Sequence, residues 1–271
     1  MALNDVSLTA GMRSNLLQLQ GTSRMIDRTQ ERLSTGKQVN TALDNPTNFF
    51  AAQAHMNRAN DFSVRKDGMA EAIQNVKASD AGITSINSLV EAAKGLAAAA
   101  LGTSNTVDRG SFSTQYQTLI TQINTLASDS GYRGTNLLTG ATLTVNFNED
   151  ASSSLSVKGF TATNSGLSIA VPTNAWTADG DITLSQSNLS TATNELRKQS
   201  KNLANNLNII TTRQDFTDNM MATLKTGSDN LTLADMNNEG ANMLMLQTRQ
   251  SLGTTALSMS SQAAQSILRL F

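Results

Sequence analysis

Three short motifs in this sequence match, letter by letter, the motifs that line the pocket of serine enzymes acylated by β-lactams. The matches are S-x-x-K at Ser34–Lys37 and Ser63–Lys66, K-T-G at Lys225–Gly227, and S-D-N at Ser228–Asn230. In those enzymes the motifs form separate walls of one pocket, in the order S-x-x-K, S-D-N, K-T-G. Here K-T-G directly precedes S-D-N, and consecutive residues cannot form two facing walls. We therefore interpret the segment as a turn in which Gly227 ends a helix and Ser228 or Asp229 caps the next one.

Other catalytic arrangements need residues that the sequence does not supply. A histidine-activated nucleophile would have to use His55, the only histidine, and the absence of cysteine excludes thiolate nucleophiles and thiolate metal sites. No G-x-S-x-G, H-E-x-x-H or phosphate-binding glycine loop occurs, and the acidic residues are scattered along the chain. We predict that the protein is not an enzyme and has no catalytic, cofactor-binding or metal-binding residues.

Composition favours long helices over a compact globule. Aromatic residues make up only 4% of the 271 residues and proline occurs twice, whereas Ala, Ser, Thr, Asn, Gln and Leu dominate. Such a chain suits extended helices that meet along narrow apolar seams.

Charge and hydropathy argue against two classes of partner. The 20 basic and 21 acidic residues are interspersed and give a net charge of −1, so no basic surface for nucleic acid or an anionic membrane is expected. No stretch approaches the ~20 apolar residues of a membrane span. The first residues, MALNDVSLTAGMRSN, lack the apolar core of a signal peptide, so we expect secretion, if it occurs, by another route.

Both ends of the chain show an apolar residue every three or four positions, which predicts amphipathic helices over 1–33 and 234–271. Small or polar residues such as Ser23, Gln30 and Gly253 interrupt this pattern, so each helix has too little apolar surface to be stable alone in water. We expect the helices to pair with each other or with other copies through one seam: Met12, Leu16, Leu19, Ile26, Leu33, Leu246, Leu257, Ala264, Ile267, Leu270 and Phe271.

The middle of the chain predicts a second helical region with a small β-hairpin. Connectors are expected at 34–56, which contains Asn45-Pro46, and at 225–233. Residues 57–160 and 188–224 should form long helices with a hairpin near 142–158, where apolar and polar residues alternate, and 161–187 should form a short variable surface segment. The fold class is mostly α, an elongated bundle of coiled-coil-like helices with the two terminal helices paired. The expected core of its central part is Met69, Ile73, Val76, Ile83, Val90, Leu196, Leu203, Leu207 and Ile210.

Three segments of the chain resemble bacterial flagellin. They are LQGTSRMIDRTQERLSTGKQVNTALDNPTNFFAA near the N-terminus, GYRGTNLLTG at 131–140, and the ending SLGTTALSMSSQAAQSILRLF. The resemblance implies an extracellular structural subunit that is exported without a cleavable signal peptide and polymerises into the flagellar filament used for motility. It further implies that the terminal helices build an inner tube and order on assembly, and that the middle helices and hairpin build an outer tube.

The same resemblance implies a set of partners. These are other copies of the chain or other flagellins, the flagellar export apparatus and a flagellin chaperone, and the filament cap and hook-filament junction proteins. In many flagellins, the segment matching 88–97 carries an arginine pair recognised by the innate-immune flagellin receptor of animals. Here Ala92 and Lys94 occupy the arginine positions and Gly95 the usual glutamate, so strong receptor activation is not expected.

Two alternative functions fit the same pattern of helices. A hook-filament junction protein has flagellin-like ends but joins the filament and does not propagate it. A soluble helical adaptor or chaperone would use its terminal helices to hold another protein in a discrete complex.

Overall fold

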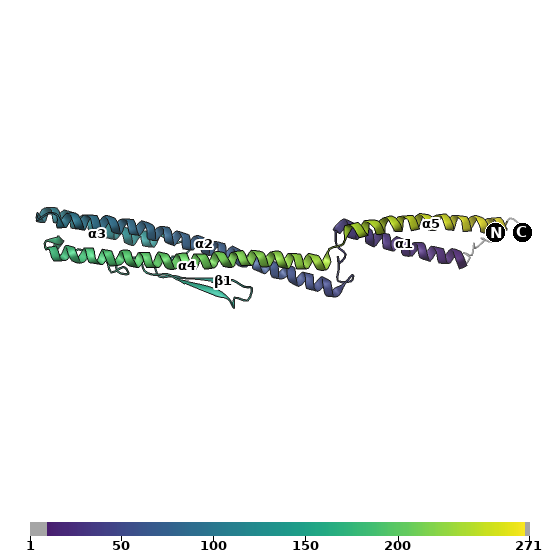
Figure 1. The fold of residues 1–271 in the computed structure, drawn as a ribbon, viewed down its shortest axis with the longest axis horizontal. Helices are drawn as coiled ribbons and strands as arrows, with labels where there is room; N and C mark the ends of the chain where they lie inside the picture. Colours follow the sequence, from purple (N-terminus) through teal and green to yellow (C-terminus); the bar gives the residue numbers. More distant parts are fainter. Residues whose placement is uncertain (1–9, 269–271) are drawn as a thin grey trace, which may run out of the picture. The chain divides into compact units, whose positions relative to one another are not determined.

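The computed structural model describes residues 10–268. Its elements are α1 (Ala10–Thr35), α2 (Pro46–Leu101), α3 (Thr106–Asp129), β1 (Thr142–Asn146), β2 (Ser154–Lys158), the short turn η1 (Asn174–Trp176), α4 (Asp179–Thr232) and α5 (Met236–Leu268) (Figure 1). The chain divides into a terminal unit, made of the residues up to Asn57 and those from Leu224 onward, and a central unit, Arg58–Thr223. The mostly α fold with one small hairpin is the predicted class. Within the described range, no helix has the length and apolarity needed to cross a membrane.

The core of the central unit is built from apolar residues repeated every seven positions. On α2 the buried series is Met69, Val76, Ile83, Val90 and Ala97, and on α4 it is Ile182, Leu189, Leu196, Leu203 and Ile210. A seven-residue repeat keeps one stripe of a helix turned toward its neighbours, as in coiled coils. α3 adds Tyr116, Ile120 and Ile123 to the same core, and the hairpin adds Val145 and Val157.

Polar contacts fix the directions of these helices. Lys94 on α2 donates to Thr193 on α4 at 2.7 Å, and toward the other end of the pair Lys66 lies 2.6 Å from Asp218. The two helices are therefore antiparallel. Arg109, at the start of α3, is almost fully buried and contacts Asp179 at the start of α4, so α3 and α4 run in the same direction.

The hairpin forms where the alternating pattern predicts it. β1 and β2 are antiparallel, with Thr142 opposite Lys158 and Asn146 opposite Ser154. Val145 and Val157 are buried, and the Ser and Thr residues between the apolar positions are mostly exposed. This half-buried alternation is what a strand with one face on a core requires.

The second long helix begins earlier than the sequence suggested. The sequence predicts a helix from residue 57, but α2 begins at Pro46. Proline lacks an amide hydrogen that the first helical turn would leave unpaired, and its fixed φ suits that position. The side chain of Asn45 accepts a hydrogen bond from the Asn48 amide at 3.1 Å, as a helix cap does. The Asn-Pro pair thus starts the helix, and 46–56 is not a connector.

The expected boundaries of α4 are wrong at both ends. The helix begins at Asp179, well before residue 188, and continues through K-T-G-S-D-N to Thr232. The interpretation of Gly227 and Ser228 as a helix end and a cap is therefore incorrect. The seven-residue series from Ile182 to Ile210 continues with buried Thr217 and Leu224, so packing keeps this segment helical despite its turn-forming residues. The break falls at 233–235 instead.

Left-handed backbone in η1 gives a testable effect on stability. Asn174, Ala175 and Trp176 have φ angles of 48°, 48° and 60°. Because Ala175 is exposed and its Cβ disfavours this conformation, Ala175→Gly should stabilise the central unit by about 1 kcal/mol. The matched change Ala98→Gly, on the exposed side of α2, should destabilise by about 1 kcal/mol. Urea unfolding measures both, and equal destabilisation by the two changes would contradict the prediction.

Candidate assembly surface

The terminal unit is organised by the pairing of α1 with α5. The two helices lie side by side (Figure 1). Gly253 of α5 faces Leu19 of α1, and Glu239 near the start of α5 binds Arg32 near the end of α1. The helices are therefore antiparallel, and segments far apart in the sequence form one two-helix structure.

The α1 side of this contact differs from the predicted seam at alternate positions. Met12 is buried and Leu19, Ile26 and Leu33 are half-buried, but Leu16 is 37% exposed. The positions between them are taken by Thr22 and Thr29, both buried, and not by Ser23 and Gln30. The Thr22 hydroxyl donates to the Gln18 carbonyl at 2.9 Å, so its polar group is satisfied while its methyl group is buried. Leu16 consequently lies on an exposed face of α1.

The α5 side contains the predicted residues as far as the structure describes them. Leu246 is 4% exposed, and Leu257 is half-buried. The side chains of Ala264 and Ile267, and the whole of Leu270 and Phe271, lie outside the described residues. A seam that alternates leucine with Thr22, Thr29 and Gly253 buries little apolar surface for its length, so pairing alone stabilises the two helices weakly.

Gly253 is needed for the close approach of the two helices. A Cβ built at Gly253 would lie 3.0 Å from Cδ2 of Leu19, closer than ordinary packing allows. We expect Gly253→Ala to destabilise the α1–α5 pair by about 1 kcal/mol, because an overpacking cost of about 1–3 kcal/mol outweighs a helix-propensity gain of about 1 kcal/mol. Hydrogen exchange of the α1 and α5 amides would report the change.

Gly240 supplies the matched control on the same helix. A Cβ at Gly240 meets no atom within 4 Å, so Gly240→Ala should raise helix stability by about 1 kcal/mol. Equal slowing of exchange by both substitutions would show that α1 does not constrain Gly253.

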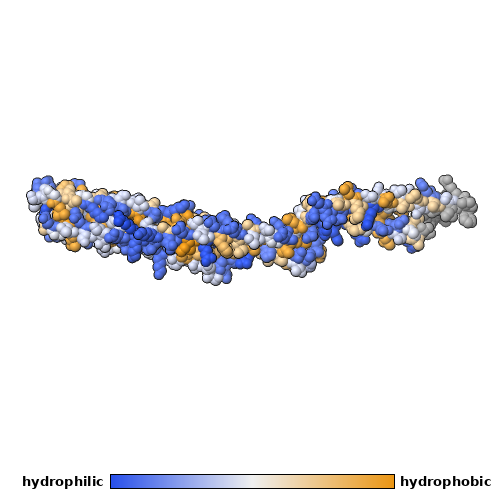
Figure 2. Space-filling view, viewed as in Figure 1, coloured by the Kyte–Doolittle hydropathy of each residue, from blue (hydrophilic) through white to orange (hydrophobic). Residues whose placement is uncertain are grey.

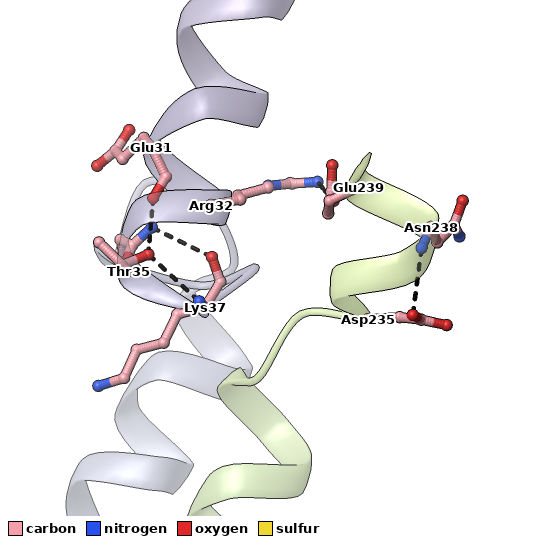
Figure 3. A network of polar contacts seen from close by, with 8 residues as sticks. Glu31, Arg32, Thr35, Lys37, Asp235, Asn238 and Glu239 are labelled. Carbon is pink, nitrogen blue, oxygen red and sulfur yellow. Dashed lines mark hydrogen bonds and ion pairs between the residues drawn. The ribbon is translucent and has the colours of Figure 1, made fainter. Parts of the chain in front are cut away.

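A polar network closes the end of the pair at the connector (Figure 3). Arg32 Nη1 lies 2.9 Å from Glu239 Oε1, and the Glu239 residue is 9% exposed. The carboxylate of Asp235 caps α5 by accepting from the amides of Asn237 and Asn238. In the segment between α1 and α2, the amide of Gln38 donates to the carbonyl of Thr232, the last residue of α4, at 2.8 Å. These bonds fix where α1 ends and α5 begins.

The connector contains a turn at residues 40–44, which the carboxylate of Asp44 closes and which leaves Leu43 exposed. The Asp44 carboxylate accepts hydrogen bonds from the amides of Thr41 and Asn40, at 2.9 and 3.1 Å. These bonds hold the pKa of Asp44 below its usual value, and the bond from Thr41 contributes most. Because the folded-state pKa is lowered, this stabilisation of the turn is present above the unfolded-state pKa and is lost as the pH falls through the folded one. Leu43, beside Asp44, is 96% exposed.

The terminal unit exposes many other large apolar side chains. Figure 2 shows apolar patches on its surface between polar ones. The residues are Leu16, Leu17, Met25, Leu43, Phe50, Leu233, Met236, Leu244, Met245, Leu252 and Met259. All of these except Leu43, Phe50 and Leu233 lie on α1 or α5. Single exposed apolar residues are normal, but this many on two helices with a thin seam indicate contact with other molecules.

The predicted core residues lie inside the central unit. Met69, Ile73, Val76, Ile83, Val90, Leu196, Leu203 and Ile210 are buried, and Leu207 is half-buried against them. The segment compared with the receptor motif lies on α2, where Ala92 and Gly95 are exposed. The Lys94 ammonium is occupied by Glu91 at 2.9 Å and by the Thr193 hydroxyl.

The motifs that resemble an acylating enzyme are not assembled into a pocket. K-T-G and S-D-N are successive residues of α4, and Lys66 of one S-x-x-K match forms an ion pair with Asp218. His55 is half-buried on α2 beside Gly227. Across residues 10–268, no three His, Asp or Glu side chains gather in a way that could hold a metal ion.

Comparison with known proteins identifies the family. A family model described as the bacterial flagellin N-terminal helical region matches residues 6–142. Flagellin FljM of Caulobacter vibrioides is 30% identical, with 100% of both chains covered. The chain belongs to the bacterial flagellin family. The flagellin of Brucella melitensis is 29% identical over 99% of this chain and 97% of its own. The crystal structure of Bacillus cereus flagellin matches 55% of this chain and 88% of its own, with a TM-score of 0.49 and 19% identity.

Membership confirms the resemblance seen in the sequence. Flagellins are structural subunits that polymerise into the bacterial flagellar filament, outside the cell, so the chain is a structural protein. The relatives matched over their whole length are flagellins and not junction proteins or adaptors. The geometry described above can therefore be interpreted as that of a filament subunit.

Proposed function

We propose that the α1–α5 unit carries the contacts between subunits in the filament, and that these two helices become fully ordered only on assembly. The observation that supports this most directly is that the outer faces of the two helices expose large apolar side chains, whereas the face between them contains small and polar residues. The inner face uses Thr22, Thr29 and Gly253, whereas leucine and methionine side chains are exposed on the outer faces. The stabilisation that the pair lacks would then come from neighbouring copies, which links folding to association.

This arrangement favours an open polymer over a closed oligomer. The exposed leucines and methionines of α1 and α5 differ in number and spacing, and α1 and α5 are not related by an internal repeat. Contacts between two different patches are heterologous and, when the rotation does not close, generate helical filaments. The proposal includes the placement that the resemblance to flagellin implies, with the terminal unit in an inner tube and the central unit in an outer tube.

The remaining assignments extend the same proposal. The subunit would pass through the flagellar export apparatus without a cleavable signal peptide, held before export by a flagellin chaperone. At the filament it would meet the cap, the junction proteins and other flagellins. No catalytic activity is assigned to the chain. Of residues 161–178, between the hairpin and α4, only the exposed ones would contribute to a short variable surface of the filament, because Ala162, Leu167, Ile169 and Trp176 are buried in the core.

Seeded growth tests the proposal. Purified chain would be added to short filament seeds and followed by light scattering and electron microscopy, with far-UV circular dichroism on the same sample. Uniform elongation with a rise in helicity is expected. Binding at seed ends without elongation would support a junction protein, and a discrete soluble complex with unchanged helicity would support an adaptor.

A further inference from the structure

Methionines are prominent among the apolar side chains that the terminal unit exposes. Met25, Met236, Met245 and Met259 are 46%, 46%, 45% and 60% exposed. Met69, in the core of the central unit, is 0% exposed. The thioether of methionine is oxidised by peroxides when solvent reaches it, so these four side chains are more open to this chemistry than Met69.

Two of the exposed methionines, Met245 and Met259, lie along one surface of α5, and Met236, at the start of the helix, is not on it. Met245, Leu252 and Met259 recur every seven residues and therefore share one face of the helix. Leu252, between the methionines, is 65% exposed, so three apolar side chains recur on this face, with the exposed Thr248, Arg249 and Thr255 between them. The antiparallel register that sets Leu19 against Gly253 and Arg32 against Glu239 places Met25 of α1 level with residues near Met245.

We propose that Met245 and Met259, together with Met25, are oxidation sites, and that their sulfoxides prevent the chain from joining the filament. The inference rests on the proposed function, because it takes a second copy of the chain as the molecule that covers this stripe. Its argument is that the stripe belongs to the helix pair assigned to subunit contacts. The proposal goes beyond the subunit contacts because it makes assembly depend on whether these methionines are oxidised in the free subunit.

The chemistry needs only an external peroxide. The methionine sulfur attacks one oxygen of hydrogen peroxide, the O–O bond breaks, and an S–O bond forms. The thioether is oxidised by two electrons to the sulfoxide, and the peroxide is reduced to water, whose second proton comes from the attacked oxygen. The product is a polar, chiral side chain in place of a flexible apolar one.

The consequence for assembly follows from burial. A sulfoxide oxygen that is buried against another subunit without a donor loses its hydrogen bonds to water. We expect each oxidised methionine in the contact to lower the affinity for the growing end about tenfold. Once a subunit is in the filament, the same contact should exclude peroxide from the sulfur.

The test compares oxidised monomer, oxidised filament and an oxidation-resistant variant. Monomer treated with hydrogen peroxide and then freed of it should carry one added oxygen at Met245, Met259 and Met25, but not at Met69, and should elongate seeds poorly. Preformed filaments treated identically should show little modification at these three sites. The triple change Met25→Leu, Met245→Leu and Met259→Leu conserves volume, so the variant should elongate seeds with or without treatment.

Two results would overturn the inference. One is normal elongation by monomer in which mass spectrometry shows the three sulfoxides. The other is equal loss of elongation in treated wild type and treated triple variant, which would place the damage elsewhere. If the untreated triple variant elongates seeds poorly, a second test takes its place. Oxidised wild-type monomer is treated with methionine sulfoxide reductases, and its elongation of seeds must then return. Absence of growth in untreated wild type would contradict the proposed function, while the preference for Met245 and Met259 over Met69 would still be measured in the monomer.

Discussion

Leu246→Asp should abolish elongation of filament seeds while leaving the central unit folded. Leu246 is 4% exposed on α5, in the contact with α1, and it is not part of the core of the central unit. A carboxylate at this position would be buried without a partner, which costs several kcal/mol in real proteins. Because the α1–α5 seam buries little apolar surface, a penalty of that size exceeds the free energy by which the seam stabilises the helix pair. Light scattering with seeds measures elongation, and thermal unfolding followed by circular dichroism reports the central unit.

Leu246→Met is the control for this substitution. Methionine has nearly the same volume as leucine and is apolar, so elongation should continue at a rate close to that of the wild type. Leu257 is half-buried on the same helix, and Leu257→Asp should act in the same direction as Leu246→Asp. Normal filaments from both aspartate variants would show that the α1–α5 seam is not required for assembly.

Trp176→Ala should cause the largest loss of stability in the central unit. Trp176 is 0% exposed, and its ring centroid lies 4.8 Å from that of Tyr116. Its indole Nε1 donates to the Ser185 hydroxyl at 3.3 Å, so η1, α3 and α4 meet at this side chain. Burial of the Tyr116 hydroxyl in the same cluster raises the pKa of Tyr116 to about 12. Removing the indole leaves a cavity and should lower the free energy of unfolding by about 3–5 kcal/mol.

Urea unfolding followed by circular dichroism measures this loss, since the substitution removes the only tryptophan and with it its fluorescence. Trp176→Phe keeps most of the ring surface and loses the indole hydrogen bond, so it should cost less than Trp176→Ala. If Trp176→Ala lowered the free energy of unfolding by less than about 1 kcal/mol, the cluster would not be part of a rigid core.

The sequence predicts those parts of the fold that depend on a regular repeat. Alternation of Leu143, Val145 and Phe147 with polar residues is enough to place the hairpin, because a strand with one buried face requires it. The core helices follow from the spacing of residues such as Met69, Val76 and Leu196, and all three are buried. Family membership was likewise evident from segments near both ends of the chain.

Helix boundaries were harder to predict because local and long-range signals disagree there. Asn45-Pro46 resembles a break, but the same two residues are a good helix start. K-T-G-S-D-N resembles a turn, yet Thr217 and Leu224 continue the seven-residue series of α4 up to it. Extending that series past Ile210 would have revealed the longer helix. Propensity is a weak signal, and packing along a repeat overrides it.

The face of α1 that meets α5 could not be chosen from the sequence alone. Two possible faces share Met12, Leu19, Ile26 and Leu33, and they differ in whether Leu16, Ser23 and Gln30 or the residues just before them point inward. Apolar character favoured Leu16, but the structure buries Thr22 and Thr29 and leaves Leu16 exposed. The Arg32–Glu239 ion pair, which helps to fix this register, joins residues too far apart in the sequence to be recognised as partners.

Hydrogen exchange of the free subunit and of the filament tests most directly the claim that α1 and α5 carry the subunit contacts. The amides of Ala10–Thr35 and Met236–Leu268 should exchange quickly in the monomer and become strongly protected in the filament, whereas those of Thr106–Asp129 in the central core should be protected in both states. Equal protection of α1 and α5 before and after assembly, with new protection confined to the central unit, would contradict the account.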